Sequence, residues 1–559
     1  MNATKKHLLI TITSLLIIIL SVYPPCNNIF FDYSVIGSRY IISISLFVMN
    51  LHLVFSKTEI KGINSIIIGI LLLLVWHITR TYVEMPLHTH KLLQPISVLV
   101  SILFFCKIGK KQQIIIDIAL ILTCLIISVH IVLQYFVSHV FDTLNYYNGP
   151  FDNPAGTAFA ISSIQPLLIH YAIKYNKYSV SIFIISLISL TAIIITGSRT
   201  SILTCCIILW LYMKKNDKFD KPIFVASSII LSTVFVTLVF KKFDSIEGRL
   251  LIWKHLFSSI DMVPLFGCGP YGLTTILMDS QSSQSNIFPT SEQLLLDNIY
   301  YPYNELISAY ITNGPLFCIG LVIILVLTIK IAKKDSPYFY GIFAFIIFSM
   351  FSYPSRYPFL WLVFSYYLVM SIKTESDNLI ILKSIKLFDI IFSIILIITT
   401  ITDLSFEFKW KQISNSKNES VSNSKTISSN FLKISEKWNG NPLFLYEFAS
   451  ELNLEQNYIG SNIILEQSER YIYDYNTTYL KGENYIALEE YEQAIACFDR
   501  CHKMCPAKIA PLYRMLIIYQ NIDENKAIEM SKKIINYPEK IDSDLSQDIR
   551  DYAYNYLQQ

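Results

Sequence analysis

Charged residues are scarce in this chain. Lysine, arginine, aspartate and glutamate make up 16% of its 559 residues, and the net charge is only +3, which argues against nucleic-acid binding. Segments of about ten residues with alternating hydrophobicity are also lacking, which excludes a transmembrane β-barrel. No clear small-residue cleavage site follows the first apolar run. We therefore expect that run to be an uncleaved first helix and not a removed signal peptide.

Long apolar stretches fill the first 402 residues, and the mean hydropathy of the chain is +0.45. At a rise of about 1.5 Å per residue, roughly thirteen stretches are candidate membrane spans. They lie near residues 8–22, 35–55, 63–79, 92–106, 113–138, 154–173, 179–196, 200–213, 223–240, 305–329, 338–352, 357–372 and 387–402. The sequence predicts an all-α fold, in which residues 1–402 form a polytopic bundle of about 12–14 transmembrane helices.

Lysine and arginine are separated along this part of the chain. The lysines cluster in alternate short connections, at Lys57/Lys61, Lys107/Lys110/Lys111, Lys174/Lys177, Lys214/Lys215/Lys218/Lys221, Lys330/Lys333/Lys334 and Lys373/Lys383/Lys386. Such loops mark the cytoplasmic face. Threading the chain then places the five arginines of residues 1–402 at the opposite face: Arg39, Arg80, Arg199, Arg249 and Arg356. The planar, permanently charged guanidinium suits phosphate, so this pattern predicts a site for an anionic substrate outside the cytoplasm.

Three segments at the arginine face carry motifs. The first is the loop Asn145–Gly156, and the second is the tight turn Thr196–Ser201. The third is a long segment, residues 241–303, which we expect to form a large extracytoplasmic loop because connections of this length are often functional. It contains Gly248-Arg249 and Trp253, the glycine-rich turn Pro264–Gly272 and a polar stretch from Asp279 to Thr290.

Composition changes after residue 402. Residues 403–430, rich in Ser, Asn and Lys from position 411, are predicted to be a linker, and residues 431–559 a soluble α-helical repeat domain. Gly482, Tyr485, Ala494, Phe498 and Pro506 recur at the spacing of a tetratricopeptide repeat, a helix pair of about 34 residues. The segments 441–474 and 507–540 are expected to be degenerate copies. An arbitrary helical hairpin is the alternative.

Cysteine indicates little chemistry. Cys497, Cys501 and Cys505 share one face of a predicted helix, which favours core packing over a metal site because a fourth ligand is missing.

Arg199 and Arg249 are the main candidates for binding substrate. Arg199 follows Gly197-Ser198 at the expected outer end of a helix, where backbone N–H groups and the helix dipole would add to its charge. An interfacial anchor that reaches lipid headgroups is the alternative for Arg199 alone. Arg249, Trp253 and the turn Gly267-Cys268-Gly269 together favour a diphosphate site.

An ordered series of motifs resembles the O-antigen ligase/polymerase family of integral membrane glycosyltransferases. The series covers about residues 145–372 and comprises Gly149-Pro-Phe-Asp-Asn-Pro-Ala-Gly156, Gly197-Ser-Arg-Thr-Ser201, Gly248-Arg249, Trp253, Leu265-Phe-Gly-Cys-Gly269, Tyr303-Asn-Glu-Leu306, Gly314 and Phe351-Ser-Tyr-Pro354. The resemblance implies transfer of a glycan from a polyprenyl diphosphate carrier to an acceptor hydroxyl, outside the cytoplasmic membrane of a bacterium. The acceptor would be a lipid A core sugar, a growing polymer or a protein hydroxyl, with the lipid A core favoured.

Carried over by position, Arg199 and Arg249 would stabilise the leaving diphosphate and replace a metal ion, so no metal or cofactor is expected. The chain departs from the family at the base, since Tyr303 stands where His is common and Thr312-Asn313 where an acidic residue often precedes the glycine. Glu305 would then deprotonate or orient the acceptor, although a solvated carboxylate at a helix start is the alternative. His88 and His90 are further candidate bases.

The remaining predicted substrate-binding residues surround these positions. They are Arg80, Asn153, Ser198, Trp253, Gly267, Gly269, Tyr303, Asn304 and Arg356. The repeats would lie on the same side as the arginines and bind an acceptor or a protein partner. A transporter of lipid-linked sugars is the alternative from another class, but the low charge of the spans argues against it.

Overall fold

The computed structural model describes the chain in segments. They are residues 18, 22–23, 34–55, 64–84, 89–141, 147–175, 179–215, 229, 232–233, 236–237, 240, 244–284, 292, 294–373, 379–416, 424–438, 440–538 and 543–558. Every regular element within them is helical, which confirms the predicted all-α class.

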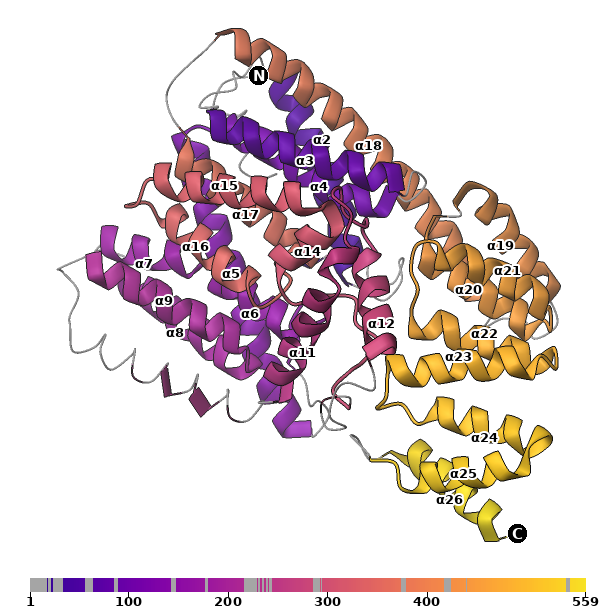
Figure 1. The fold of residues 1–559 in the computed structure, drawn as a ribbon. Coiled ribbons are helices and arrows are strands. Elements are labelled where there is room, and N and C mark those ends of the chain that lie inside the picture. The colour runs from indigo at the N-terminus through magenta and orange to yellow at the C-terminus, as the bar shows by residue number, and fades with distance from the viewer. Residues whose placement is uncertain are drawn as a thin grey trace.

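Apolar helices form the larger part of the molecule (Figure 1). They are α2 (Ser34–Phe55), α3 (Ser65–Glu84), α4 (Thr89–Cys106), α5 (Lys110–Phe141), α6 (Pro154–Ser162), α7 (Gln165–Lys174), α8 (Ser179–Thr196), α9 (Arg199–Lys215), α14 (Glu305–Asn313), α15 (Pro315–Ile331), α16 (Pro337–Ser349), α17 (Pro358–Ile372) and α18 (Leu379–Ser416). Proline begins α6, α15, α16 and α17, where its missing N–H costs no intrahelical hydrogen bond.

Four described stretches are long and apolar enough to cross a membrane: Ser65–Glu84, Lys110–Ser138, Ser179–Thr196 and Ile385–Asn415. Shorter apolar helices accompany them at Lys91–Cys106, Arg199–Tyr212, Pro315–Ile331, Pro337–Ser349 and Pro358–Ile372. Large apolar side chains on the outside of the bundle, such as Leu72 and Phe183, fit a lipid surface. The total of 12–14 spans stays a prediction.

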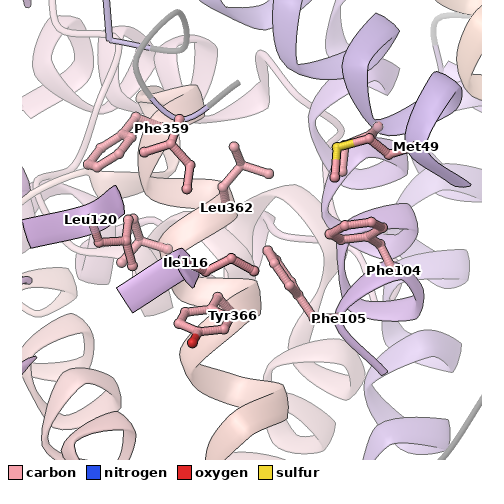
Figure 2. A pocket seen from close by; sticks show the side chains of 11 residues that line it. Met49, Phe104, Phe105, Ile116, Leu120, Phe359, Leu362 and Tyr366 are labelled. Atoms are coloured by element: carbon pink, nitrogen blue, oxygen red, sulfur yellow. The ribbon is translucent and has the colours of Figure 1, made fainter. Parts of the chain in front are cut away.

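The centre of the bundle is packed with aliphatic and aromatic side chains. Helix α4 contacts α2, α17 and α18, and these contacts join segments from both ends of the apolar region. A small cavity here is lined by apolar groups, including Met49, Phe105 and Leu362, with the ring of Tyr366 at one side (Figure 2). No charged side chain lines this cavity, so it offers no polar chemistry.

Several lysine-bearing connections converge at one end of the bundle. The Nζ of Lys373 donates to the carbonyl oxygens of Cys106, at 2.9 Å, and Ile108, at 2.8 Å. Lys107 forms a buried ion pair with Asp389 and donates to Asn50 Oδ1 at 3.0 Å. The connections after α4 and α17 therefore lie together, as expected for loops on one membrane face.

The long segment before α14 is largely helical. It contains α11 (Asp244–Ser258), η2 (Ile260–Met262) and α12 (Gly272–Gln284), which lie between the bundle and the C-terminal helices (Figure 1). Buried Ile252, Leu256 and Leu277 hold α11 and α12 together in one small core.

Much of the stretch 403–430, which we predict to be a linker, is helical. Helix α18 continues to Ser416, and α19 begins at Ser424. The cause is an apolar face on the last turns of α18, where Phe406, Trp410 and Ile413 are buried in one cluster with Phe444. Only residues 417–423 lie outside the described part.

The C-terminal helices stack in antiparallel pairs. They are α19 (Ser424–Trp438), α20 (Pro442–Leu454), α21 (Tyr458–Glu469), α22 (Tyr475–Ala487), α23 (Tyr491–Met504), α24 (Ala510–Ile522), α25 (Glu524–Ile535) and α26 (Asp544–Gln558). In the pair α22–α23, a Cβ on Gly482 would lie 2.8 Å from Phe498 Cζ, so glycine is needed for this close approach. Ala494 and Phe498 are fully buried, which confirms the predicted pairing of these helices.

Candidate functional site

Arg199 is the first residue of α9, so the predicted helix start is confirmed. The preceding Gly197 has φ of 64°, a left-handed conformation that glycine adopts without steric cost and that lets the chain turn sharply from α8 into α9. Ser198 donates to Ser201 Oγ at 3.1 Å within the first turn. Arg199 therefore lies at the N-terminus of α9, which is the positive end of the helix dipole.

Arg249 lies on α11, close enough to Arg199 for their charges to interact. Its Nη1 donates to the carbonyl of Phe351 at 2.8 Å, and its Cζ lies 4.9 Å from the centre of the Tyr303 ring. Burial and the neighbouring charge of Arg199 lower the pKa of Arg249. An anion between the two guanidinium groups would relieve this repulsion.

Three tyrosine rings separate Arg249 from Arg356. Tyr353 stacks on Tyr301 with ring centres 5.0 Å apart and contacts Tyr303 at 5.4 Å. The Cζ of Arg356 lies 5.4 Å from the Tyr301 ring and 6.0 Å from the Tyr353 ring. The tyrosine rings thus form a wall shared by the two arginines, and their contacts with both guanidinium groups are of the cation–π kind.

The loop before α6 joins this cluster. Asp152 forms an ion pair with Arg356, and Asn153 Nδ2 donates to Tyr353 Oη at 2.9 Å. Asn153 also caps α6 by accepting from Ala155 N at 2.8 Å. One side chain therefore ties the start of α6 to the tyrosine wall.

Residues at the start of α14 hold the chain around η3 (Pro354–Arg356). Asn304 Oδ1 caps α14 by accepting from Leu306 N, and its Nδ2 donates to Met350 O at 3.1 Å. Glu305 Oε1 accepts from Ser355 N at 3.0 Å. Glu305 is thus directed at the backbone that presents Arg356.

Trp253 supports the same segment from α11. Its indole Nε1 donates to Pro302 O at 2.7 Å, one residue before Tyr303. Tyr303 has φ of 54°, which non-glycine residues rarely adopt. Such a conformation persists only where surrounding contacts impose it, and it is commonest at functional positions.

Arg80 and the glycine-rich turn form a separate group. Arg80 donates from Nε to Phe266 O and from Nη2 to Gly267 O, both at 2.7 Å, and it pairs with Glu84. Cys268 N and Gly269 N then donate to the carbonyls of Ile311 and Thr312, near the end of α14. Because α14 rises about 1.5 Å per residue, this turn lies roughly 12 Å along the helix from Asn304. Arg80, Gly267 and Gly269 are therefore grouped at the end of α14, whereas Tyr303 and Arg249 lie at its start.

The structure adds residues that the sequence did not single out. Asp152, Tyr301 and Tyr353 complete the cluster, and Asp152 and Tyr353 belong to motifs that had been noted for their neighbours. Lys91 lies near Arg39 and Arg356 and contacts the Tyr271 ring at 4.5 Å. The candidate bases His88 and the His90 side chain lie outside the described residues. In the described part of the chain, no three His, Cys, Asp or Glu side chains gather as metal ligands.

Comparison with known proteins bears on part of this site. Residues 184–323 match a family model described as O-Antigen ligase, and this stretch contains Arg199, Arg249 and Glu305. No curated protein matches the chain significantly. Among solved structures, the crystal structure of the APC/C hetero-tetramer Cut9-Hcn1 is similar at 9% identity, over 92% of this chain and 83% of that chain, with a TM-score of 0.23. A likeness this weak does not bear on the fold.

Proposed function

We propose that the protein transfers a glycan from a polyprenyl diphosphate carrier to an acceptor hydroxyl, because residues 184–323 match a family model described as O-Antigen ligase. The reaction would take place at the extracytoplasmic side of a bacterial inner membrane, with a lipid A core as the favoured acceptor. The observation that carries this proposal is the placement of Arg249, on α11, against the Tyr303 ring at 4.9 Å, where its charge interacts with that of Arg199 at the N-terminus of α9.

In the proposed reaction, the acceptor oxygen attacks the anomeric carbon of the glycan. The bond from that carbon to the diphosphate oxygen breaks, and the lipid diphosphate leaves with the electron pair. Negative charge on the leaving group increases in the transition state, so fixed guanidinium groups bind it more strongly than they bind the donor. Arg199 and Arg249 would supply this stabilisation, and Tyr303 would keep the Arg249 guanidinium in place.

The acceptor hydroxyl must also lose a proton. Glu305 is our first candidate for the base, and Asp152 is the second because its carboxylate lies against Arg356 in the same cluster. Tyr303 is an unsuitable base in its neutral form, but its hydroxyl could orient the sugar.

Transfer by the purified protein tests this function, with a polyprenyl diphosphate-linked oligosaccharide as donor and a lipid A core as acceptor. Replacing Arg199 or Arg249 with Ala should lower kcat by about 100-fold or more, a loss typical of removing one donor to a developing charge. Lys variants should recover little, since a point charge does not replace the bidentate fork. Full activity of both Lys variants, or of both Ala variants, would contradict the role of a diphosphate clamp.

A matched control is Arg514→Lys, which alters an arginine of the repeat domain whose ion pair with Glu483 joins α24 to α22. This variant should transfer at the rate of the wild type. The wild type and the control variant should also stay active in the presence of a chelator, because the two arginines are proposed to bind the diphosphate without a metal ion.

A further inference from the structure

Asp474 connects the repeat domain to the segment that carries the tyrosine wall. It is the N-cap of α22, where its Oδ1 accepts from Thr477 N at 3.0 Å. Its Oδ2 accepts from Tyr300 Oη at 2.8 Å and from Asn298 Nδ2 at 3.1 Å. Asp474 is 3% exposed, and its bonds to Thr477 are buried, whereas the partner Tyr300 is 39% exposed. One carboxylate oxygen therefore accepts a hydrogen bond within the repeat domain, and the other accepts hydrogen bonds from residues 298–300.

The segment that Asp474 holds leads directly into the candidate site. Tyr300 precedes Tyr301, whose ring lies against Arg356, and Tyr303 lies against Arg249. Trp253 holds the intervening Pro302 carbonyl from the side of α11. The segment 298–303 is thus fastened by α11 at one point and by the repeat domain at another.

The contact with Asp474 sits in a wider interface. Buried Tyr475, Cys501, Met504 and Cys505 of the repeats share a core with Leu256 and Leu277 of α11 and α12. Around it, Arg500 pairs with Asp279, Lys508 pairs with Asp297 at 3.4 Å, and Tyr473 N donates to Thr275 Oγ1 at 3.1 Å. An apolar core with surrounding ion pairs makes this a fixed attachment, so movement at Asp474 is transmitted to residues 298–300.

We infer that Asp474 is a positioning residue: through Tyr300 it holds the tyrosine wall against Arg249 and Arg356, so the repeat domain sets the geometry of the diphosphate site. This inference rests on the proposed function and goes beyond acceptor recruitment, since it assigns the repeats a part in arranging the groups that contact the donor.

Two substitutions separate this bridge from the helix cap. In Asp474→Ser the hydroxyl can still cap α22, because serine is a common N-cap residue. The shorter side chain has only one oxygen and cannot also reach Tyr300. Tyr300→Phe removes the Tyr300–Asp474 hydrogen bond from the other side, keeps the hydrogen bond from Asn298 and leaves the cap untouched. Tyr300→Phe should lower kcat for glycan transfer about tenfold, which corresponds to the loss of one hydrogen bond to a charged group. Asp474→Ser, which also loses the hydrogen bond from Asn298, should lower kcat at least as much. The KM for a lipid A core acceptor should stay unchanged.

The double variant decides whether the two residues act together. If they act through their shared hydrogen bond, Asp474→Ser combined with Tyr300→Phe should be no slower than Asp474→Ser alone. Asp523→Ser is the matched control, because Asp523 caps α25 of the same domain by accepting from Lys526 N and is remote from residues 298–303. It should transfer at the rate of the wild type.

Arg249→Ala, measured in parallel, distinguishes failure of the inference from failure of the proposed function. If Arg249→Ala is inactive while Tyr300→Phe transfers at the wild-type rate, only the positioning role is overturned. If the losses in the double variant multiply, the coupling between Asp474 and Tyr300 is overturned. If Asp474→Ser does not fold, Tyr300→Phe alone decides. If Arg249→Ala keeps full activity, the proposed function itself is wrong.

Discussion

Two carboxylates hold η3 by different contacts. Asp152 pairs with the Arg356 side chain, while Glu305 accepts from the backbone N–H of Ser355. Each contact uses one oxygen. The second oxygen of Asp152 is buried and has no hydrogen-bond partner among the described residues. Both residues therefore help to place Arg356, and either could in addition receive the proton of an acceptor.

Glu305→Gln separates these two roles. The glutamine amide oxygen can still accept from Ser355 N, so the backbone contact is kept and only the basic group is lost. If Glu305 is the base, kcat should fall about 100-fold or more, within the range for general-base catalysis, and its dependence on pH should flatten. Rates of transfer measured from pH 5 to pH 9 would show this.

Asp152→Asn provides the comparison. It removes the ion pair with Arg356, so we expect a higher KM for the donor with a smaller change in kcat. The opposite pattern, in which Glu305→Gln transfers normally and Asp152→Asn loses the pH dependence, would assign the base to Asp152.

Among the elements, α14 is held by contacts at both ends. Asn304 caps its start, and at its end the turn at Gly267 packs on the break between α14 and α15. Gly267 has φ of 78°, and a Cβ there would lie 2.4 Å from Thr312 O. Backbone cannot move aside as a flexible side chain can, so this turn requires glycine.

Gly267→Ala should therefore destabilise the protein by at least about 1–3 kcal/mol, the usual cost of an unfavourable backbone conformation. The control is Gly248→Ala in α11, where a Cβ would meet nothing within 4 Å. Alanine in a helix should stabilise the protein there by about 0.5–1 kcal/mol. Thermal unfolding in detergent measures both changes, and equal stability of the two variants would contradict this account of the turn.

Helix α23 carries a histidine that makes stability depend on pH. Burial lowers the pKa of His502 to about 4, with Lys533 as a further cause, and its ring packs on Tyr537 at 5.2 Å. The unfolded chain, with a pKa near 6.5, binds the proton first. Stability is therefore fully present above pH 6.5 and is lost as the pH falls towards 4.

His502→Phe should keep the ring contact and remove this titration. Burial also lowers the pKa of His255 to about 4, so that residue contributes with the same sign and remains in the variant. We expect the fall in Tm between pH 7 and pH 5 to be clearly smaller in His502→Phe than in the wild type. An unchanged fall would show that folding does not lower the pKa of His502.

For the whole molecule, the arrangement of charge relates the site to the repeats. The connections at Lys107 and Lys373 meet at one end of the bundle, whereas Arg249 and Arg356 share the tyrosine wall. The repeats pack on α12 and on residues 297–300, which lead into this wall. If the lysine end is cytoplasmic, the repeat domain lies outside the cytoplasm.

A reporter active only in the cytoplasm, fused after Gln559, should therefore be silent. The same reporter fused after Lys373, in a lysine-bearing connection, should be active and serves as the control. A strong signal from the fusion after Gln559 would overturn the proposed sidedness, and with it the placement of the glycan transfer site.

Local patterns in the sequence determined much of this protein. Long apolar runs predicted the helices of the bundle, because apolar side chains in such runs favour burial in a bilayer or a core. The start of α9 at Arg199 was predictable from Gly197, and the pairing of α22 with α23 from Gly482 and Phe498. Each of these depends on neighbours in the chain or on a repeated spacing, which is why no tertiary information was needed.

Only the tertiary structure decided which polar side chains meet. Asp152 and Arg356 are 204 residues apart, and Tyr300 and Asp474 are 174 residues apart, so no spacing rule connects either pair. The same holds for Arg80, which binds the turn at Gly267 and not the tyrosine wall, and for the buried face that makes residues 403–416 helical. Packing between helices from distant parts of the chain determines these contacts. The sequence of one segment does not indicate which distant segment it will contact.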